Sequence, residues 1–135
     1  MQAHDYAIWK SLILEDADNI KHHPNPSESL CLLAVREHAA ALQYIRNQTD
    51  VICLAAVRED GMVLQYVQHQ TPEICLAAVQ EDGRALQHVQ QQSPEICLAA
   101  VQQNGLVLCH VLCQTPSICL AAVKEDGGSL KYVLV

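Results

Sequence analysis

The sequence predicts an all-α fold, an α-solenoid of about six 22-residue repeats with two helices each. Three observations predict it. A cysteine recurs every 22 residues inside nearly the same apolar phrase, at Cys31, Cys53, Cys75, Cys97 and Cys119. A helix start signal precedes most of these phrases, and a polar turn, usually with glycine, follows them. A fixed period of about 20 to 50 residues is typical of repeat architectures.

The first helix of a repeat is best specified in the repeat that starts at Thr71. Thr71 suits the N-cap, Pro72 the first helical position, and Glu73 the positive end of the helix dipole. The apolar run 74–79 fits a buried helix or a buried strand. The Thr-Pro-Glu start and the Ala-Ala pair favour a helix over roughly 72–82.

A second helix is expected over roughly 84–91, after the turn at Asp82-Gly83. The glycine suits a left-handed position at the helix C-terminus. Glycine recurs at this phase at Gly61, Gly105 and Gly127. The apolar stripe of the second helix is Ala85, Leu86 and Val89. Two short helices cannot bury their faces alone, so stacked pairs are expected to share one continuous core.

The array extends towards the N-terminus as a degenerate capping repeat at residues 6–27. Trp9 lies 22 residues before Cys31, so it occupies the cysteine position without a gap in register. Its bulk, that of Leu14, and the proline break that follows suit a terminal cap; an unrelated N-terminal helix is the alternative. Residues 28–135 then form five regular repeats, and residues 1–135 form one domain.

A leucine-rich or β-solenoid fold is the main alternative, because its repeats have similar lengths. Those repeats need an L-x-L strand core and often a ladder of Asn or Gly turns. Here the apolar run is continuous and begins with a helix cap. The helical solenoid is therefore favoured.

The phrase LAAVxxDGxALxxV resembles the tandem helical repeats of a bacterial family classed as a domain of unknown function, found in proteins of intracellular bacteria among others. The matching residues are Leu76–Val79, Asp82-Gly83, Ala85-Leu86 and Val89, with counterparts in neighbouring repeats. The resemblance covers about residues 28–135 and implies no catalytic residues. The chain departs from the family in a shorter spacer and in Ala39, which replaces the repeat glycine.

Composition and charge restrict the classes of function. Half of the residues are hydrophobic and 17% are charged, which is too apolar for a disordered chain. The formal net charge is −7, and no basic stripe for DNA or RNA is visible, so no nucleic-acid partner is expected. Mild acidity suits a basic patch on a partner protein.

Apolar runs, the N-terminal sequence and the cysteine spacing indicate the compartment of the protein and the redox state of its cysteines. No apolar run of about 18 residues occurs and the N-terminus lacks a signal-peptide pattern, so neither a membrane span nor export by that route is expected. Equivalent cysteines in stacked helices lie about 9–10 Å apart, whereas a disulfide needs Cα atoms within about 7 Å. We therefore expect reduced, buried thiols in a cytoplasm, either the cell's own or that of a host cell.

Three columns of side chains vary with the repeat. The ring column is Tyr44, Tyr66, His88, His110 and Tyr132. It fits either half-buried rings that cover the core or a ladder of rings that lines a binding face. The glutamine column is Gln48, Gln70, Gln92 and Gln114, expected to close a helix or to bridge to the next repeat. Acidic turns such as Glu81-Asp82 fit a solvated turn or an acidic ridge.

One patch breaks the pattern near the C-terminus. Positions that are polar in early repeats become apolar at Leu112, Cys113, Leu134 and Val135. A terminal repeat normally presents a polar outer face. An exposed apolar patch often marks an interface, so these residues are a candidate contact for a homodimer or another protein; a frayed terminus is the alternative.

Catalytic and metal signatures are absent from the sequence. It has no G-x-S-x-G, no phosphate-binding glycine loop and no H-E-x-x-H. Cys109 and Cys113 are expected four residues apart on one helix, but His110 points about 100° away from Cys109 on that helix, and a fourth zinc ligand is missing. We expect no enzyme, metal or cofactor.

The sequence therefore predicts a non-catalytic module for protein–protein interaction that presents a rigid helical-repeat surface. The alternative is a small acidic inhibitor or decoy, of phage or pathogen type, that blocks a basic, nucleic-acid-binding host protein. The identity of the partner does not follow from the sequence.

Overall fold

The computed structural model describes residues 3–134, and over these residues six α-helices alternate with six 3-10 helices, without strands. The α-helices are α1 (Ala3–Glu15), α2 (Glu28–Glu37), α3 (Asp50–Glu59), α4 (Pro72–Glu81), α5 (Pro94–Gln103) and α6 (Pro116–Glu125). The 3-10 helices are η1 (Ala17–His22), η2 (Ala39–Tyr44), η3 (Gly61–Tyr66), η4 (Gly83–His88), η5 (Gly105–His110) and η6 (Gly127–Tyr132).

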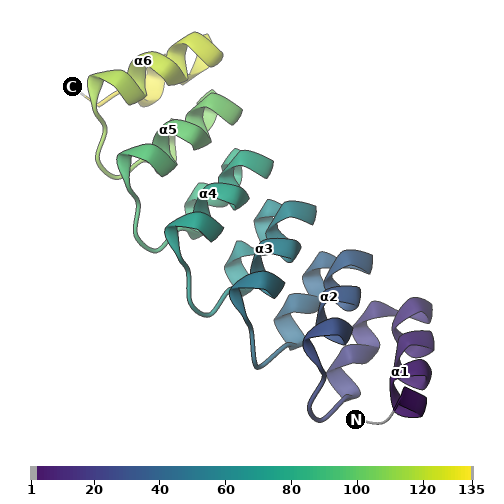
Figure 1. Ribbon diagram of the computed structural model, residues 1–135. Coiled ribbons are helices and arrows are strands. Elements are labelled where there is room, and N and C mark those ends of the chain that lie inside the picture. Colours follow the sequence, from purple (N-terminus) through teal and green to yellow (C-terminus); the bar gives the residue numbers. More distant parts are fainter. Residues whose placement is uncertain (1–2, 135) are drawn as a thin grey trace.

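The α-helices lie side by side in chain order and form one long row (Figure 1). The 3-10 helices form a second row behind them, and each contacts the 3-10 helix of the next repeat. The predicted all-α fold of stacked helix pairs is confirmed. At the N-terminal end of the row, α1 and η1 keep the order and the register of the later pairs.

Each helix from α2 to α6 begins at a hydroxyl N-cap, as the sequence predicts. The Thr71 side chain accepts a hydrogen bond of 3.2 Å from the backbone N–H of Ile74. The other caps are Ser27, Thr49, Ser93 and Thr115. Such a cap contributes about 1 kcal/mol by pairing one of the free N–H groups of the first turn.

The second element differs from the prediction. It is a six-residue 3-10 helix at Gly83–His88, not an α-helix over 84–91. Val89 has an extended backbone and its N–H donates to the carbonyl of Leu86, which ends the helix. A 3-10 helix rises about 2.0 Å per residue, so six residues span about 12 Å, close to the 15 Å of a ten-residue α-helix. The short second element can thus match the first within a 22-residue repeat.

The glycine at the start of most 3-10 helices has a different role from the one predicted. None of the glycines in the described chain has a positive φ, so the predicted left-handed conformation is wrong. A Cβ on Gly83 would lie 2.6 Å from the carbonyl oxygen of Ala100 in the next repeat. Gly61 and Gly105 approach the next α-helix in the same way. Glycine is required because η4 lies directly against the backbone of α5.

Ala39 occupies this glycine position in η2. It is buried, and η2 packs less extensively against α3 than the later 3-10 helices pack against their following α-helices. The extra methyl group thus accompanies a looser contact between these two repeats.

The core is one continuous column of small and medium side chains. Each inner repeat buries the same positions, for example Ile74, Cys75, Ala78, Val79 and Leu86. Each helix from α2 to α6 buries one alanine at the same position, Ala78 in α4, which allows close approach of the neighbouring helices.

Glutamine side chains bridge each inner repeat to the next, one of the two roles predicted for them. The Nε2 amide of Gln70 donates to the carbonyl of His88 (2.8 Å), and its Oε1 accepts from the N–H of Gln90 (2.9 Å). The Cys75 thiol donates to the same Oε1 at 3.3 Å. We call this arrangement the glutamine bridge. It recurs at Gln48, Gln92 and Gln114.

Four cysteines of the repeat column, Cys31, Cys53, Cys75 and Cys97, are buried as predicted, whereas Cys119 in the last repeat is half-buried. All seven thiols are free. Burial raises the pKa of the Cys31 thiol from its ordinary value of 9.0 to about 11, and the Glu28 carboxylate adds to the effect. Burial likewise raises the pKa of Cys53 to about 11, with Asp50 as the second cause. These thiols therefore stay neutral at physiological pH.

Replacing Gly83 by Ala should lower the free energy of unfolding by about 1–3 kcal/mol, because the methyl group meets the Ala100 carbonyl. Gly127→Ala is the matched control, since nothing lies within 4 Å of its Cβ position. It should leave stability unchanged or raise it by up to about 1 kcal/mol. Denaturant unfolding measures both variants, and equal losses would contradict the close-approach explanation.

The protein should lose stability as the pH rises from about 9 to about 11. In this range the folded protein holds the Cys31 and Cys53 protons more tightly than the unfolded chain does, so the free energy of unfolding falls. Urea unfolding across the range measures this. The loss should be smaller in Cys31→Ala/Cys53→Ala and unchanged in Cys109→Ala, whose thiol is exposed. Identical pH profiles for the two variants would refute the assignment.

Candidate functional site

The C-terminal end of the row exposes leucines whose equivalents in inner repeats are buried or half-buried. Leu130 in η6 is 65% exposed, whereas the equivalent Leu108 and Leu86 are fully buried. Leu120 in α6 is 71% exposed, whereas Leu98 is half-buried against the core. Each inner leucine is covered by the repeat that follows it. We call Leu120 and Leu130 the end face.

The predicted C-terminal patch lies beside the end face. Leu112 and Leu134 are 80% and 73% exposed, and Cys113 is exposed. Their backbones are fixed, because the N–H of Leu112 donates to Gln92 (3.0 Å) and that of Leu134 to Gln114 (2.9 Å). We call Leu112, Cys113 and Leu134 the apolar rim. Val135, the fourth predicted residue, lies outside the described residues.

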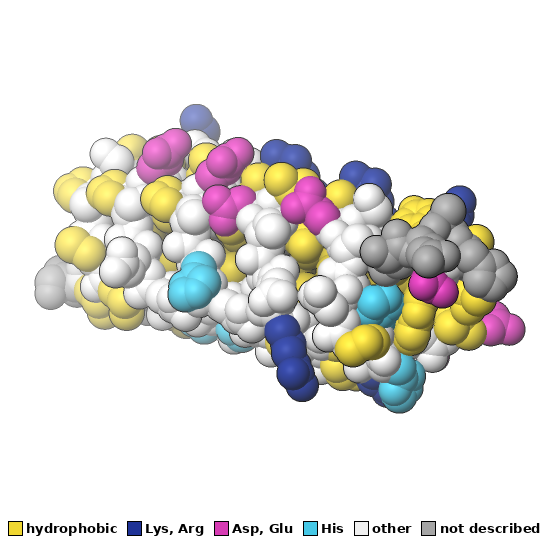
Figure 2. All heavy atoms as spheres, turned by 60° about the horizontal axis from the view of Figure 1, so that its bottom comes forward, with side chains coloured by type: hydrophobic (Ala, Val, Ile, Leu, Met, Phe, Trp, Pro, Cys, Tyr) yellow, Lys and Arg dark blue, Asp and Glu magenta, His cyan; other side chains and the backbone are white. Residues whose placement is uncertain are grey.

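Hydrophobic side chains are visible at this end of the molecule, on the left in Figure 2, and others are visible at the opposite end. Leu112 and Leu134 occupy equivalent positions in adjacent repeats, so they line one edge of the row. The earlier residues of this column, Gln90, Gln68 and Arg46, are exposed and polar. The edge therefore changes from polar to apolar towards α6.

The end face was not predicted from the sequence. Leu120 and Leu130 carry the same residue type as the buried leucines of inner repeats, so the repeat pattern marks them as core. The usable signal was that the last repeat has no polar substitution at these positions. The rim was found because its residues depart from the repeat.

The ring column closes the ends of the 3-10 helices. Tyr44, Tyr66 and Tyr132 are half-buried and pack against the core, and His88 is also half-buried. His110 is exposed. In the four later members, the backbone carbonyl accepts the glutamine-bridge hydrogen bond. The column thus contributes to the fold.

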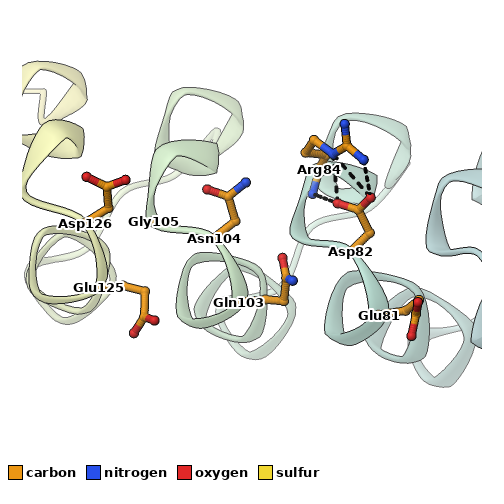
Figure 3. A pocket seen from close by; sticks show the side chains of 8 residues that line it. All are labelled: Glu81, Asp82, Arg84, Gln103, Asn104, Gly105, Glu125 and Asp126. Atoms are coloured by element: carbon orange, nitrogen blue, oxygen red, sulfur yellow. Dashed lines mark hydrogen bonds and ion pairs between the residues drawn. The ribbon is translucent and has the colours of Figure 1, made fainter.

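The acidic turns have a definite structural role. The side chains of Asp60, Asp82, Asn104 and Asp126 accept a hydrogen bond from the N–H two residues on and cap the 3-10 helices. In Figure 3 the Asp and Asn side chains point towards the 3-10 helices, whereas Glu81 and Glu125 point away from them. The open hollow there has a volume of about 450 Å³.

Two further contacts are made at these turns. Arg84 pairs with Asp82 at 2.7 Å, and its hydrogen bonds hold the pKa of Asp82 below its usual range. The Oε1 of Gln103 accepts from the N–H of Gly83 at 2.6 Å, which links η4 to α5. Gln103, which stands where the neighbouring repeats have Glu81 and Glu125, is therefore a link between repeats.

The described residues contain no group of three or more His, Cys, Asp or Glu side chains placed to hold a metal ion. Cys109 lies in η5, but Cys113 lies beyond the end of that helix, so the predicted spacing on one helix is wrong. None of the helices in the described part of the chain is long and apolar enough to cross a membrane.

Comparison with known proteins gives one match. Residues 71–112 match the family described as Domain of unknown function (DUF4116). The match begins at the N-cap of α4 and ends on the rim residue Leu112. No curated protein and no solved structure matches the chain. The resemblance predicted from the repeats is thus confirmed over residues 71–112, as similarity to an uncharacterised domain family.

Proposed function

We propose that the chain is a non-catalytic protein-interaction module that binds its partner through the end face and the apolar rim. One observation carries the proposal: Leu130 is 65% exposed where the equivalent leucines of inner repeats are fully buried. Exposed apolar surface of this kind is typical of an interface.

The energetics favour such a contact. Covering a leucine side chain contributes about 1.5–3 kcal/mol, and four leucines lie on the end face and the rim. They stand on helices and on backbone fixed by glutamine bridges, so little ordering accompanies binding. A partner that stacks on α6 and η6 would cover these leucines as each inner repeat covers the one before it.

The partner is another protein, and a second copy of this chain docked at the same end is the simplest case. The inner cysteines are free thiols, which fits a reducing compartment such as the cytoplasm of the cell or of a host.

Leu120→Lys/Leu130→Lys should weaken binding at least tenfold, because a charged side chain opposes burial of the face. Val51→Lys is the matched control, since Val51 is 54% exposed on α3, away from the end. Sedimentation measures self-association, and immobilised protein measures capture of a partner. Circular dichroism should show the same helix content in all three proteins. Equal binding by all three would refute the proposal.

The salt response separates this proposal from the acidic inhibitor. Apolar docking should change little between low and high salt, because screening acts on charges. A complex that weakens steeply with salt, and that Glu81→Gln/Glu125→Gln weakens more than the leucine variant does, would favour the acidic turns instead.

A further inference from the structure

The glutamine bridge is missing at one junction of the row. Pro26 occupies the position, 22 residues before Gln48, from which the side-chain amide bridges at the later junctions. Proline carries no side-chain amide, so η1 and η2 lack this connection.

The groups that a bridging amide would contact are nevertheless present. Tyr44 carbonyl, Arg46 N–H and the Cys31 thiol are the equivalents of the groups on Tyr66, Gln68 and Cys53 that bind Gln48. None of the three forms a hydrogen bond with the described residues 3–134. The Cys31 side chain is only 2% exposed, so its thiol faces this niche from the core.

A cavity marks the place. It has a volume of about 420 Å³ and is lined by Pro24, Pro26, Cys31, Tyr44 and Arg46, among others. The equivalent hollow beside Gln70 measures about 160 Å³. The larger volume at the first junction is the space that a glutamine side chain partly fills at the later one.

We propose that this cavity binds a primary carboxamide, the side-chain group of a glutamine or asparagine on another molecule. The carbonyl of Tyr44 requires a donor, whereas the N–H of Arg46 and the thiol of Cys31 require an acceptor. A carboxamide presents an N–H and a C=O on one carbon, and Gln70 shows that this group meets the same three contacts at once. A carboxylate offers no hydrogen to the carbonyl, and a thioether offers none either.

The surroundings restrict the molecule that carries the amide. Lys21, His22, His23 and Arg46 line the cavity, and no carboxylate does. The Lys21 ammonium lies 5.4 Å from the centre of the Tyr44 ring. This charge favours a carboxamide on a neutral or acidic peptide. The site lies at the opposite end of the row from the end face and does not depend on the function proposed there.

The test is a titration of isotope-labelled protein followed by amide NMR. N-acetyl-glutamine methylamide should shift the Arg46 N–H resonance in a saturable way. The glutamate and methionine analogues have the same backbone amides and should bind at least tenfold more weakly, because each leaves the Tyr44 carbonyl without a donor. Free L-glutamine distinguishes the sources: equal or tighter binding indicates a free metabolite, and weaker binding a peptide side chain.

Two proline variants make the test specific. Pro26→Gln supplies the missing bridge from within the chain, so it should raise the melting temperature and abolish the shifts caused by the glutamine probe. Pro24 lines the same cavity but does not occupy the position equivalent to the bridging glutamines. Pro24→Gln should therefore leave the shifts caused by the glutamine probe unchanged. Equal binding of the glutamine, glutamate and methionine analogues would overturn the proposal. Undiminished probe binding by a folded Pro26→Gln protein would overturn it as well.

Discussion

The structure depends on one side-chain amide repeated along the row. A 22-residue unit with a ten-residue α-helix and a six-residue 3-10 helix is too small to bury its own core, so stability comes from contacts between units. Gln70 joins the loop after η3, the start of α4 and the end of η4 through three hydrogen bonds. The bridge therefore sets both the spacing and the orientation of neighbouring repeats, and it gives the cysteine column a polar partner.

Much of the fold could be predicted from the sequence, because its signals are local. The caps, the α-helices and the buried cysteine column follow from residue type and register. The 3-10 helices do not, since the stripe of Ala85, Leu86 and Val89 fits either helix type. The role of Gly83 depends on the carbonyl of Ala100 in another repeat, 17 residues away, and a backbone approach of this kind leaves no local signal.

An unfilled contact between repeats occurs near each end of the row, apolar at one end and polar near the other. Every inner repeat is completed by its neighbours, so a repeat that lacks a partner or a bridge exposes an unfilled contact. At the C-terminal end this contact is apolar and consists of exposed leucines. At the first junction it is polar and consists of a carbonyl, an N–H and a thiol around a cavity. Residues that depart from the repeat pattern, such as Leu112 and Pro26, are the sequence features from which the two proposed binding sites are inferred.

The direct test of the central claim is the stability of Gln70→Met against that of Gln87→Met. Gln70 bonds to the next repeat, whereas the exposed Gln87 bonds only to the carbonyl of Arg84 in its own turn. Gln70→Met should lower the free energy of unfolding by about 1–3 kcal/mol, because two backbone groups lose their partner. Gln87→Met should change it by less than about 0.5 kcal/mol. Equal stability of the two variants would contradict the claim that the glutamine bridge holds the repeats together.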